Sequence, residues 1–360
     1  MEQNIKKTFY CLDEYLESDF DLQKINILLL NFNKSKINDA LMTDLCSKLR
    51  ESIDLYDLRL FLSENKLGQN SLSTLGQELQ NLTNLKYLHL DLMKNKLSDE
   101  KIKTLAGALG KCQKLESLKL YINENQITNQ GVEQLALGLR NCINIQTLDI
   151  QLPNIGIVSY NLKQLFIPLN DCANLTDLDL GLRECQISQE IEINSFEGLR
   201  NFKNLKNIHL DLYCNQIYDN QIERLGKELG LLASLTSVFL GLYFNQITSN
   251  GFSSLIEGIS NCKSIQALRL YLGKNQIGKQ DIFLKNEFKK FQNLSFMILD
   301  LSSNLLNELK ATQLSYELKQ SETITTMVVN MVRNQIGYQA NGILQNLKKA
   351  KRLVNLVTFF

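Results

Sequence analysis

Residues able to do acid–base or metal chemistry are sparse in this 360-residue chain, and the sequence keeps them apart. The two histidines, His89 and His209, occupy the same position in two repeats that are four repeat lengths apart. At a strand spacing of ~4.8 Å, four repeats place the two rings about 19 Å apart. This separation is too long for a shared metal ion or an acid–base pair, so we interpret both histidines as solvent-facing surface residues.

Carboxylates on the same predicted strand face offer a second chemistry. Asp149 and Asp179 fall at equivalent positions of neighbouring repeats, and the others are scattered at Asp91, Asp211 and Asp300. Two adjacent carboxylates could form a weak cation site or a pair with a raised pKa. An open, solvated sheet provides no pocket that excludes water, so we favour simple surface charges and predict no catalytic residues and no metal site.

Motifs of cofactor-dependent enzymes are absent. The sequence contains no GxxxxGK[ST] loop, no GxGxxG, no HExxH and no GxSxG, so we expect a non-enzymatic protein without a cofactor. Its 39 basic and 38 acidic residues leave a net charge of +1, which gives no electrostatic reason to expect nucleic acid as partner. Eight cysteines without CxxC, a charged N-terminus and no long apolar run predict reduced thiols, no membrane insertion and a cytoplasmic location.

A repeat of about 30 residues runs along the chain. The stretch LKYLHLDLMKNKL from Leu85 is echoed by LESLKLYINENQI from Leu115 and by LKNIHLDLYCNQI from Leu205. Each copy begins at an apolar anchor residue, and successive anchors are 30 or 29 residues apart. The anchors are Ile25, Leu55, Leu85, Leu115, Ile145, Leu175, Leu205, Leu235, Ile265, Leu294 and Ile324, with a partial copy at Leu353.

Two hydrophobic periods alternate within each copy. Leu88 and Leu90 alternate with polar residues, the period of two that places apolar side chains on one face of a strand. About ten residues later, Ile102, Leu105 and Leu109 form the apolar stripe of an amphipathic helix. Neither element buries its apolar face alone, so stacked copies must share one core, with right-handed crossovers that keep the strands parallel. The sequence predicts an α/β solenoid of about eleven repeats, with strands on the concave face and helices on the convex face.

An asparagine ends the predicted strand in eight copies. Its amide both donates and accepts hydrogen bonds, so a column of these side chains satisfies turn backbone groups that would otherwise be buried without partners. Cys185 takes this position in its own copy. We predict a structural ladder of Asn65, Asn95, Asn125, Asn215, Asn245, Asn275, Asn304 and Asn334.

Four cysteines share another repeat position, three residues before the next anchor. Leucine and phenylalanine take the same position in other copies, which marks it as part of the apolar core. We therefore interpret these thiols as structural and not as metal ligands: Cys112, Cys142, Cys172 and Cys262.

The pattern LxxLxLxLxxNxI followed by an amphipathic helix resembles the leucine-rich-repeat family. The long helical half of each copy is most similar to the ribonuclease-inhibitor-like subclass. One departure from the usual family pattern is systematic: an extra x-L pair lengthens each strand by two residues. The resemblance covers about residues 22–360, which we predict to form a single array. Residues 1–21 carry Leu12, Leu16 and Phe20 at helical spacing and predict an N-terminal helical cap.

The array is irregular in its middle and apolar at its end. Both prolines lie in the copy anchored at Ile145: Pro153 lacks a strand amide hydrogen, and Pro168 interrupts a predicted helix. We expect a local break in curvature between about residues 150 and 200, as a binding feature or as a tolerated irregularity. The final LVNLVTFF predicts a bare edge strand that pairs with a partner or a second copy.

The outward strand positions are the place to seek function, because they are free of core packing. Projected onto the predicted sheet, they gather aromatic residues and an arginine, the types that dominate protein-binding hot spots. The alternative is that the rings pack across strands for stability alone. The candidate protein-binding residues are Tyr121, Tyr213, Phe239, Tyr243, Phe244, Arg269 and Tyr271.

Three functions fit these observations. The leading hypothesis is a protein-interaction or scaffold module, in a cytoskeletal or ciliary assembly, that binds partner proteins through the concave face or the C-terminal edge. The second is a regulator of a small GTPase: the repeats also resemble the Ran GTPase-activating protein, and Arg183 or Arg333 would then supply the arginine. The third is the regulatory part of a larger enzyme, which no residue pattern in the chain supports.

Overall fold

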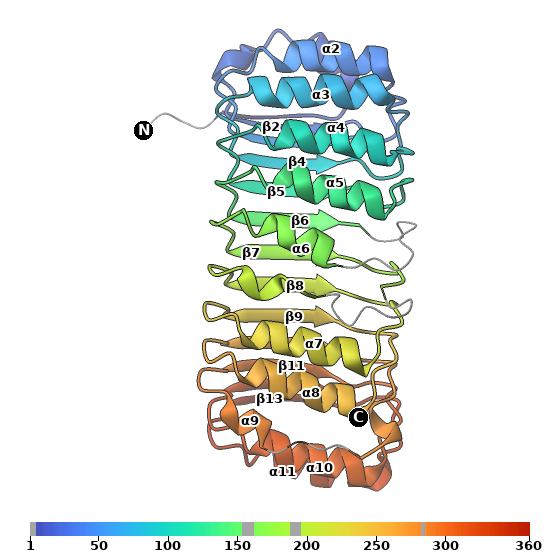
Figure 1. Ribbon diagram of the computed structural model, residues 1–360, viewed down its shortest axis with the longest axis vertical. Coiled ribbons are helices and arrows are strands. Elements are labelled where there is room, and N and C mark those ends of the chain that lie inside the picture. Colours follow the sequence, from blue (N-terminus) through green and yellow to red (C-terminus); the bar gives the residue numbers. More distant parts are fainter. Residues whose placement is uncertain (1–4, 153–161, 188–195, 282–283, 285) are drawn as a thin grey trace. The chain divides into compact units, whose positions relative to one another are not determined.

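The computed structural model describes residues 5–152, 162–187, 196–281, 284 and 286–360. The chain divides into two compact units: unit 1 comprises residues 1–158 and 164–181, and unit 2 comprises residues 159–163 and 182–360. Each unit repeats one pattern, a strand followed by a turn and usually a helix, at the 30-residue spacing predicted from the sequence (Figure 1).

Unit 1 is built on seven parallel strands among its described residues. They pair in chain order, and the register places equivalent repeat positions side by side, as for Leu88 of β4 and Leu118 of β5. The strands are β1 (Lys6–Phe9), β2 (Ile27–Asn31), β3 (Asp57–Phe61), β4 (Tyr87–Asp91), β5 (Ser117–Tyr121), β6 (Thr147–Gln151) and β7 (Asp177–Gly181).

Unit 2 has six parallel strands within the part of the chain that the structure describes. They also pair in chain order and in repeat register. These strands are β8 (Asn207–Asp211), β9 (Ser237–Gly241), β10 (Ala267–Tyr271), β11 (Phe296–Asp300), β12 (Thr326–Asn330) and β13 (Asn355–Phe359).

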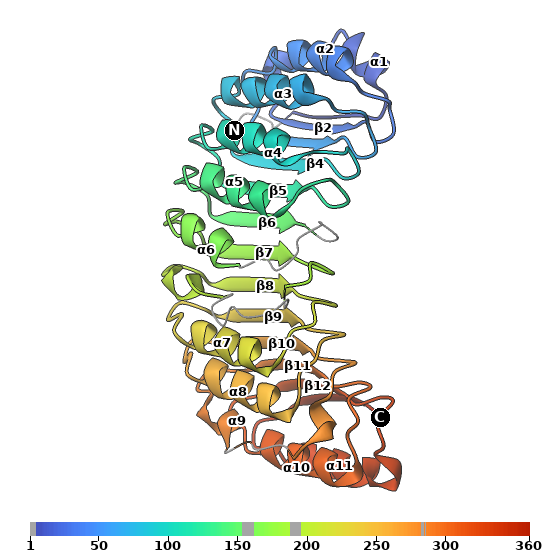
Figure 2. The ribbon, with the colours of Figure 1, turned by 45° about the vertical axis from the view of Figure 1, so that its right-hand side comes forward.

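Helices cover one face of the strands in each unit, as the turned view in Figure 2 shows. In unit 1 they are α2 (Asp39–Leu49), α3 (Gln69–Asn81), α4 (Asp99–Leu109), α5 (Asn129–Leu139) and α6 (Lys163–Leu169). In unit 2 they are α7 (Asp219–Gly230), α8 (Ser249–Ser260), α9 (Glu287–Lys290), α10 (Glu308–Lys319) and α11 (Ala340–Leu347). No helix among the described residues is both long enough and apolar enough to span a membrane.

The apolar alternation explains why these residues form strands. Leu88 and Leu90 of β4 are buried between the strands and the helices, whereas His89 between them points to the other face. Burial of each leucine side chain contributes about 2 kcal/mol. A shift of one residue in register would expose the whole apolar set, so the alternation fixes the register of every strand.

Carboxylates at the start of several helices bind the start of the helix in the next repeat. Asp99 accepts hydrogen bonds from the backbone nitrogen of Thr128 at 2.7 Å and from its hydroxyl at 2.6 Å. Asp219 accepts from the backbone nitrogen of Thr248 at 2.8 Å. These bonds satisfy helix-terminal amides that lack partners within their own helix, and they tie successive helices together. Gly131 makes room for this contact, because a Cβ there would collide with the Asp99 carboxylate.

In most of the described repeats, the turn after the strand places a non-glycine residue in the left-handed region directly before the asparagine position. Lys94 and Phe244, for example, have φ angles of 53° and 56°. The conformation costs roughly 1–2 kcal/mol per residue. The residues held this way are Glu64, Lys94, Glu124, Glu184, Cys214, Phe244, Lys274, Ser303 and Arg333.

The asparagine side chains hold these turns in place. Asn95 is 2% exposed, and its Nδ2 donates to the carbonyls of Leu62 at 2.8 Å and Met93 at 3.0 Å. Its Oδ1 accepts from the backbone nitrogen of Asn65 at 3.1 Å, one repeat earlier. The same exchange recurs at the other seven asparagines, so one side chain per repeat pairs buried backbone groups of two repeats.

The N-terminal segment differs from the helical cap predicted for residues 1–21. Lys6–Phe9 form β1, which pairs with β2, and only the short helix α1 (Leu12–Leu16) follows it. Phe9 packs edge to face on Tyr15 with ring centroids 5.2 Å apart. The added strand extends the sheet of unit 1 by one row, which the sequence pattern missed because this segment lacks a repeat anchor.

The irregular middle of the chain lies partly outside the described residues. Pro153 and residues 188–195 are outside the described residues, so the structure does not describe the predicted break in curvature. Pro168 lies within α6, which has seven residues where α4 and α5 have eleven each. Pro168 stands one residue before the end of α6, and α6 ends at the same repeat position as α4 and α5.

The predicted fold class is confirmed. Parallel strands alternate with helices at a repeat of about 30 residues, and each unit is an α/β solenoid of the leucine-rich-repeat kind. The core lies between the strand layer and the helix layer of each unit, leaving the opposite strand face free of core packing.

Replacing one ladder residue should weaken the fold strongly. We predict that Asn95→Ala lowers the free energy of unfolding by about 3 kcal/mol, because the buried Asn65 backbone nitrogen loses its partner and the carbonyls of Leu62 and Met93 each lose one hydrogen bond. Urea unfolding followed by circular dichroism would measure the change. Asn144→Ala is the control, since Asn144 is exposed and its one side-chain bond is to the Gln113 carbonyl; equal midpoints for the two variants would contradict a structural ladder.

Candidate functional site

The outward side chains of the unit 2 strands form regular rows. The central row, which we call the middle row, has one residue on each strand: His209, Phe239, Arg269, Ile298, Val328 and Val357. Apolar side chains dominate it, although this face of the strands has no helix layer over it (Figure 1). Val357 is 45% exposed. The face therefore presents apolar surface to solvent, the property that marks interaction sites.

Three aromatic rings gather where β8 and β9 end. We call Tyr213, Tyr243 and Phe244 the aromatic cluster. The rings of Tyr213 and Tyr243 are stacked with centroids 6.3 Å apart, and Phe244 lies 5.6 Å from Tyr213 and 5.7 Å from Tyr243. These spacings are typical of favourable aromatic pairs.

Phe244 has the left-handed backbone conformation of its equivalents in other repeats, but it carries an aromatic ring. It has φ of 56°, and its side chain is 40% exposed. Most other repeats place lysine, glutamate, serine or arginine at this turn position. The Lys274 ammonium lies 4.0 Å from the centre of its ring, within the range of a cation–π interaction.

Tyr243 is positioned by two neighbours. A Cβ at Gly273 would collide with the Tyr243 ring, so the glycine lets the ring lie across the next turn. The Tyr243 hydroxyl lies 3.2 Å from the Ser302 hydroxyl, two repeats further on. The ring is therefore held in one orientation before any partner arrives.

Phe239 and Arg269 make the remaining contacts of the predicted set. Phe239 packs on His209 with ring centres 4.0 Å apart and on Tyr271 at 5.0 Å. The Arg269 guanidinium lies over the Phe296 ring at 4.7 Å. The structure thus brings six of the seven candidate residues together on one face of unit 2.

The seventh candidate, Tyr121, lies in unit 1 and has other contacts. Its ring packs on His89 with centroids 4.8 Å apart, and its hydroxyl donates to Asp149 at 3.2 Å. Burial, and next the charge of Asp149, raise the pKa of Tyr121 to about 12. Tyr121 therefore belongs to the packing of the unit 1 strand face and not to the cluster in unit 2.

Sequence reasoning missed the apolar continuation of this face. Ile298, Val328 and Val357 stand four residues after their anchors, and Phe296 stands beside Arg269. Four N-terminal repeats carry Arg59, His89, Lys119 and Asp149 at that same position. The change from polar to apolar residues along this one column was the available signal.

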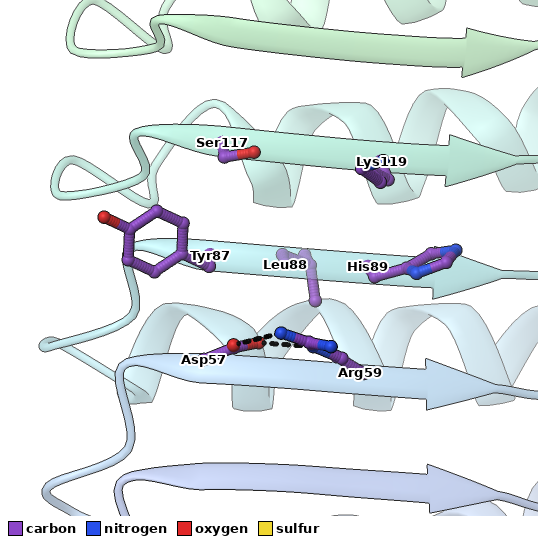
Figure 3. A pocket seen from close by; sticks show the side chains of 7 residues that line it. All are labelled: Asp57, Arg59, Tyr87, Leu88, His89, Ser117 and Lys119. Atoms are coloured by element: carbon purple, nitrogen blue, oxygen red, sulfur yellow. Dashed lines mark hydrogen bonds and ion pairs between the residues drawn. The ribbon is translucent and has the colours of Figure 1, made fainter. Parts of the chain in front are cut away.

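A shallow pocket of about 370 Å³ opens on the strand face of unit 1 (Figure 3). Its lining residues come from β3, β4 and β5. Arg59 is paired with Asp57 through bonds of 3.1 and 2.8 Å, and Lys119 lies 3.6 Å from Asp149. Both cations are compensated within unit 1, so the pocket has no unpaired charge to attract a ligand. It is lined by Asp57, Arg59, Tyr87, Leu88, His89, Ser117 and Lys119.

His89 is not the solvent-facing residue that we predicted. Its ring is half-buried between Phe61 and Tyr121, with both centroid distances 4.8 Å, and its buried Nε2 has no hydrogen-bond partner among the described residues. Burial first, and then the charge of Lys119, hold the pKa of His89 below its usual value. The neutral ring acts here as an aromatic packing element.

The carboxylates of Asp149 and Asp179 in unit 1 accept hydrogen bonds from the same side-chain amide. Gln151 Nε2 donates to Asp149 at 2.7 Å and to Asp179 at 3.2 Å. Among the residues that the structure describes, no group of three or more histidine, cysteine, aspartate or glutamate side chains is placed to hold a metal ion. The two aspartates are thus tied into a hydrogen-bonded row on the sheet.

The cysteine column is buried in the helix layer of unit 1. The Sγ atoms of Cys112, Cys142 and Cys172 donate to carbonyls of the preceding repeat at 3.6, 3.4 and 3.4 Å. Burial raises the pKa of the Cys112 thiol to about 11 and those of Cys142 and Cys172 to about 12. Protonated, hydrogen-bonded thiols are poor nucleophiles and poor metal ligands.

The two arginines of the GTPase hypothesis differ in their surroundings. Arg183 forms an ion pair with Asp211, and its guanidinium lies 5.8 Å from the ring of Tyr213. Arg333 is exposed, in a left-handed turn with φ of 60°. Of these two arginines, only Arg333 has no ion pair among the described residues.

Comparisons with known proteins identify no family for the chain. No family model matches it, and no curated protein matches it. Its backbone is similar to a chain in the crystal structure of the Rad7 and Elc1 complex in yeast, with a TM-score of 0.49 and 17% sequence identity. The match covers 92% of this chain and 77% of that chain. At this level of similarity the comparison supports no inference about function.

The buried position of His89 predicts an acid-sensitive contribution to stability. Its lowered pKa means that the unfolded chain binds the proton more readily. Stability contributed by the neutral ring is therefore present at neutral pH and is lost as the pH falls through the ordinary histidine range near 6.5. We expect the NMR titration midpoint of the His89 ring to lie below that range, with His209→Gln assigning the two signals. A midpoint at or above 6.5 would contradict the packing described here.

Thiol labelling should separate the exposed cysteines from the buried column. We predict that iodoacetamide at about pH 8 alkylates Cys11 and Cys214, which are exposed, and leaves Cys112, Cys142 and Cys172 intact. The buried thiols are protonated at that pH and shielded by the helices. Peptide mass spectrometry would locate the label, and labelling in urea is the control in which all five react. Native labelling of the column would show that the helix layer opens readily.

Proposed function

We propose that this protein is a non-enzymatic protein-binding module whose contact surface is the strand face of unit 2. The aromatic cluster is the anchor of this surface, and the middle row is its apolar floor. The observation that carries the proposal is Phe244, an exposed phenylalanine kept in a left-handed turn where other repeats use mostly polar residues.

The exposure of the Phe244 ring favours binding over packing. The left-handed φ is shared by the equivalent residues of other repeats, so the feature specific to Phe244 is an exposed aromatic ring at that position. Exposed aromatic rings on rigid turns lose little side-chain entropy on association, which is why they are enriched in interface hot spots. The cluster meets this condition, since its three rings contact one another on turns tied down by the ladder.

Cross-strand packing explains only part of the aromatic surface. It accounts for Phe239, whose ring lies between His209 and Tyr271. Phe244 also contacts Tyr213 and Tyr243, but its ring is 40% exposed at a position where other repeats place mostly polar residues. We therefore assign Phe239 a mixed role and Phe244 a role in binding.

The GTPase-regulator hypothesis has weaker support. An arginine that enters another protein's nucleotide site must be free to move, and Arg183 is held by Asp211 and Tyr213. Arg333 is exposed and has no ion pair among the described residues, but no further observation supports this role for it. We also infer that the repeats are of the ribonuclease-inhibitor-like subclass, because α2–α5 have 11, 13, 11 and 11 residues and alternate regularly with strands. Cytoplasmic, cytoskeletal or ciliary placement stays a prediction, as does pairing at the C-terminal edge.

Replacing Phe244 should separate binding from stability. We predict that Phe244→Asn reduces the proteins co-purified with the native chain by about tenfold or more, because a hot-spot ring is lost. Its free energy of unfolding should stay within about 1 kcal/mol of the wild-type value. Asparagine adopts the left-handed conformation at lower cost, and this gain offsets the loss of the ring contacts. Quantitative mass spectrometry of affinity-purified material from the protein's own cells would measure the first effect.

A matched aromatic variant on the helix layer controls this experiment. Tyr316→Asn removes an exposed ring from α10, on the opposite side of the unit 2 core. The same partners should be retained by this variant and by wild type. If Phe244→Asn retains them equally, the binding surface is not the strand face of unit 2.

A further inference from the structure

One charged residue interrupts the apolar middle row. Arg269 of β10 stands between Phe239 of β9 and Ile298 of β11, with Val328 of β12 beyond. Its guanidinium lies over the Phe296 ring at 4.7 Å, and its Nη1 donates to the Ser237 hydroxyl at 3.4 Å. Both contacts are weak ones for a full positive charge.

No carboxylate pairs with Arg269 among the described residues of unit 2. Asp211 is engaged by Arg183. Asp300 accepts from Asn330 Nδ2 at 2.9 Å and from the Ser302 backbone nitrogen at 2.8 Å. The cation is therefore left without an acidic partner in a half-buried, apolar setting, where a charge-assisted hydrogen bond is worth more than in water.

Unit 1 contains the same arrangement with its charge satisfied. Arg59 occupies the same repeat position on β3, and Asp57, two residues earlier on the strand, pairs with it at 2.8 Å. On β10 the residue two positions before Arg269 is Ala267. The alanine removes the internal carboxylate and leaves the guanidinium available to another molecule.

The spacing of the row suits one kind of partner. Neighbouring strands are ~4.8 Å apart, so a ligand that crosses them meets a new row residue at about that interval. One turn of an α-helix rises ~5.4 Å, whereas alternate residues of an extended chain are ~6.6 Å apart. A helix lying across the strands therefore matches Arg269, Ile298 and Val328 better than an extended segment does.

We propose that the strand face of unit 2 binds an amphipathic helix of a partner protein, with a carboxylate of the helix on Arg269 and apolar side chains one and two turns away on Ile298 and Val328. This inference rests on the proposed function, because it names the partner chemistry of the same surface. The aromatic cluster then borders the helix on the side where the strands end. An acidic residue followed by leucine, isoleucine or phenylalanine at three- to four-residue steps is the expected recognition pattern.

A peptide library on a helical scaffold tests this chemistry. The probe is a phage-displayed library of helix-forming peptides randomised at positions i, i+3, i+4 and i+7, selected on the full chain. We expect selected peptides to carry aspartate or glutamate at one end of the pattern and apolar residues at the others. Selection on the Arg269→Glu variant should instead enrich lysine or arginine at that position, since the charge preference is reversed.

An added carboxylate provides the sharpest variant. Ala267→Asp should rebuild the ion pair seen at Asp57 and Arg59, and so weaken selected acidic peptides about tenfold or more in fluorescence anisotropy while Arg269 itself is kept. Asn207→Asp adds the same charge on β8, at the position aligned with Ala267. It lies away from Arg269 and should have little effect on binding. Equal thermal unfolding midpoints would show that all variants are folded.

The outcomes distinguish this inference from the proposed function. Peptides that lack an acid, or that bind Arg269→Gln and Ala267→Asp as tightly as wild type, overturn the helix assignment. If those peptides are still lost on Phe244→Asn, the surface is a binding site for another kind of segment. A failure to select any peptide also overturns the inference. The proposed function is tested separately, by comparing the proteins that co-purify with wild type and with Phe244→Asn.

Discussion

The structure depends on the side-chain amide of the asparagine that follows the strand in eight repeats. Each strand must turn sharply toward the helix layer, and the turn leaves backbone groups buried away from water and places one residue in the left-handed region. Asn95 and its equivalents donate to carbonyls of their own and the preceding repeat and accept from a backbone nitrogen. A side chain with both donor and acceptor atoms is needed there, and apolar packing alone could not replace it.

Once core and turns are satisfied in this way, the outward strand positions are free to differ between repeats. The same position carries Arg59, His89, Lys119 and Asp149 in unit 1, where hydrogen bonds and ion pairs connect the polar groups to one another. In unit 2 it carries Phe239, Arg269 and aliphatic residues. The same fold therefore presents a polar strand face with internal ion pairs and hydrogen bonds in unit 1, and a mainly apolar strand face in unit 2.

The contrast between Arg59 and Arg269 shows how function enters a repeat protein without a change of fold. The two arginines occupy equivalent positions, yet only Arg59 has an aspartate two residues before it. A single residue type at the preceding outward position decides whether the guanidinium is used internally or is left for a partner. Phe244 makes the same point for the turns, because its backbone conformation is shared with Lys94 whereas its ring is not.

The sequence by itself determined the 30-residue period, the strands, the helices and the asparagine positions, because all of these follow from spacings within one repeat. Tertiary structure decided what the outward residues do. His89 is half-buried between Phe61 and Tyr121, and Lys6–Phe9 add a strand, through contacts that join residues from different repeats or from outside the repeat pattern. Such contacts depend on side-chain orientation and on neighbours about 30 residues away, which a local periodicity does not encode.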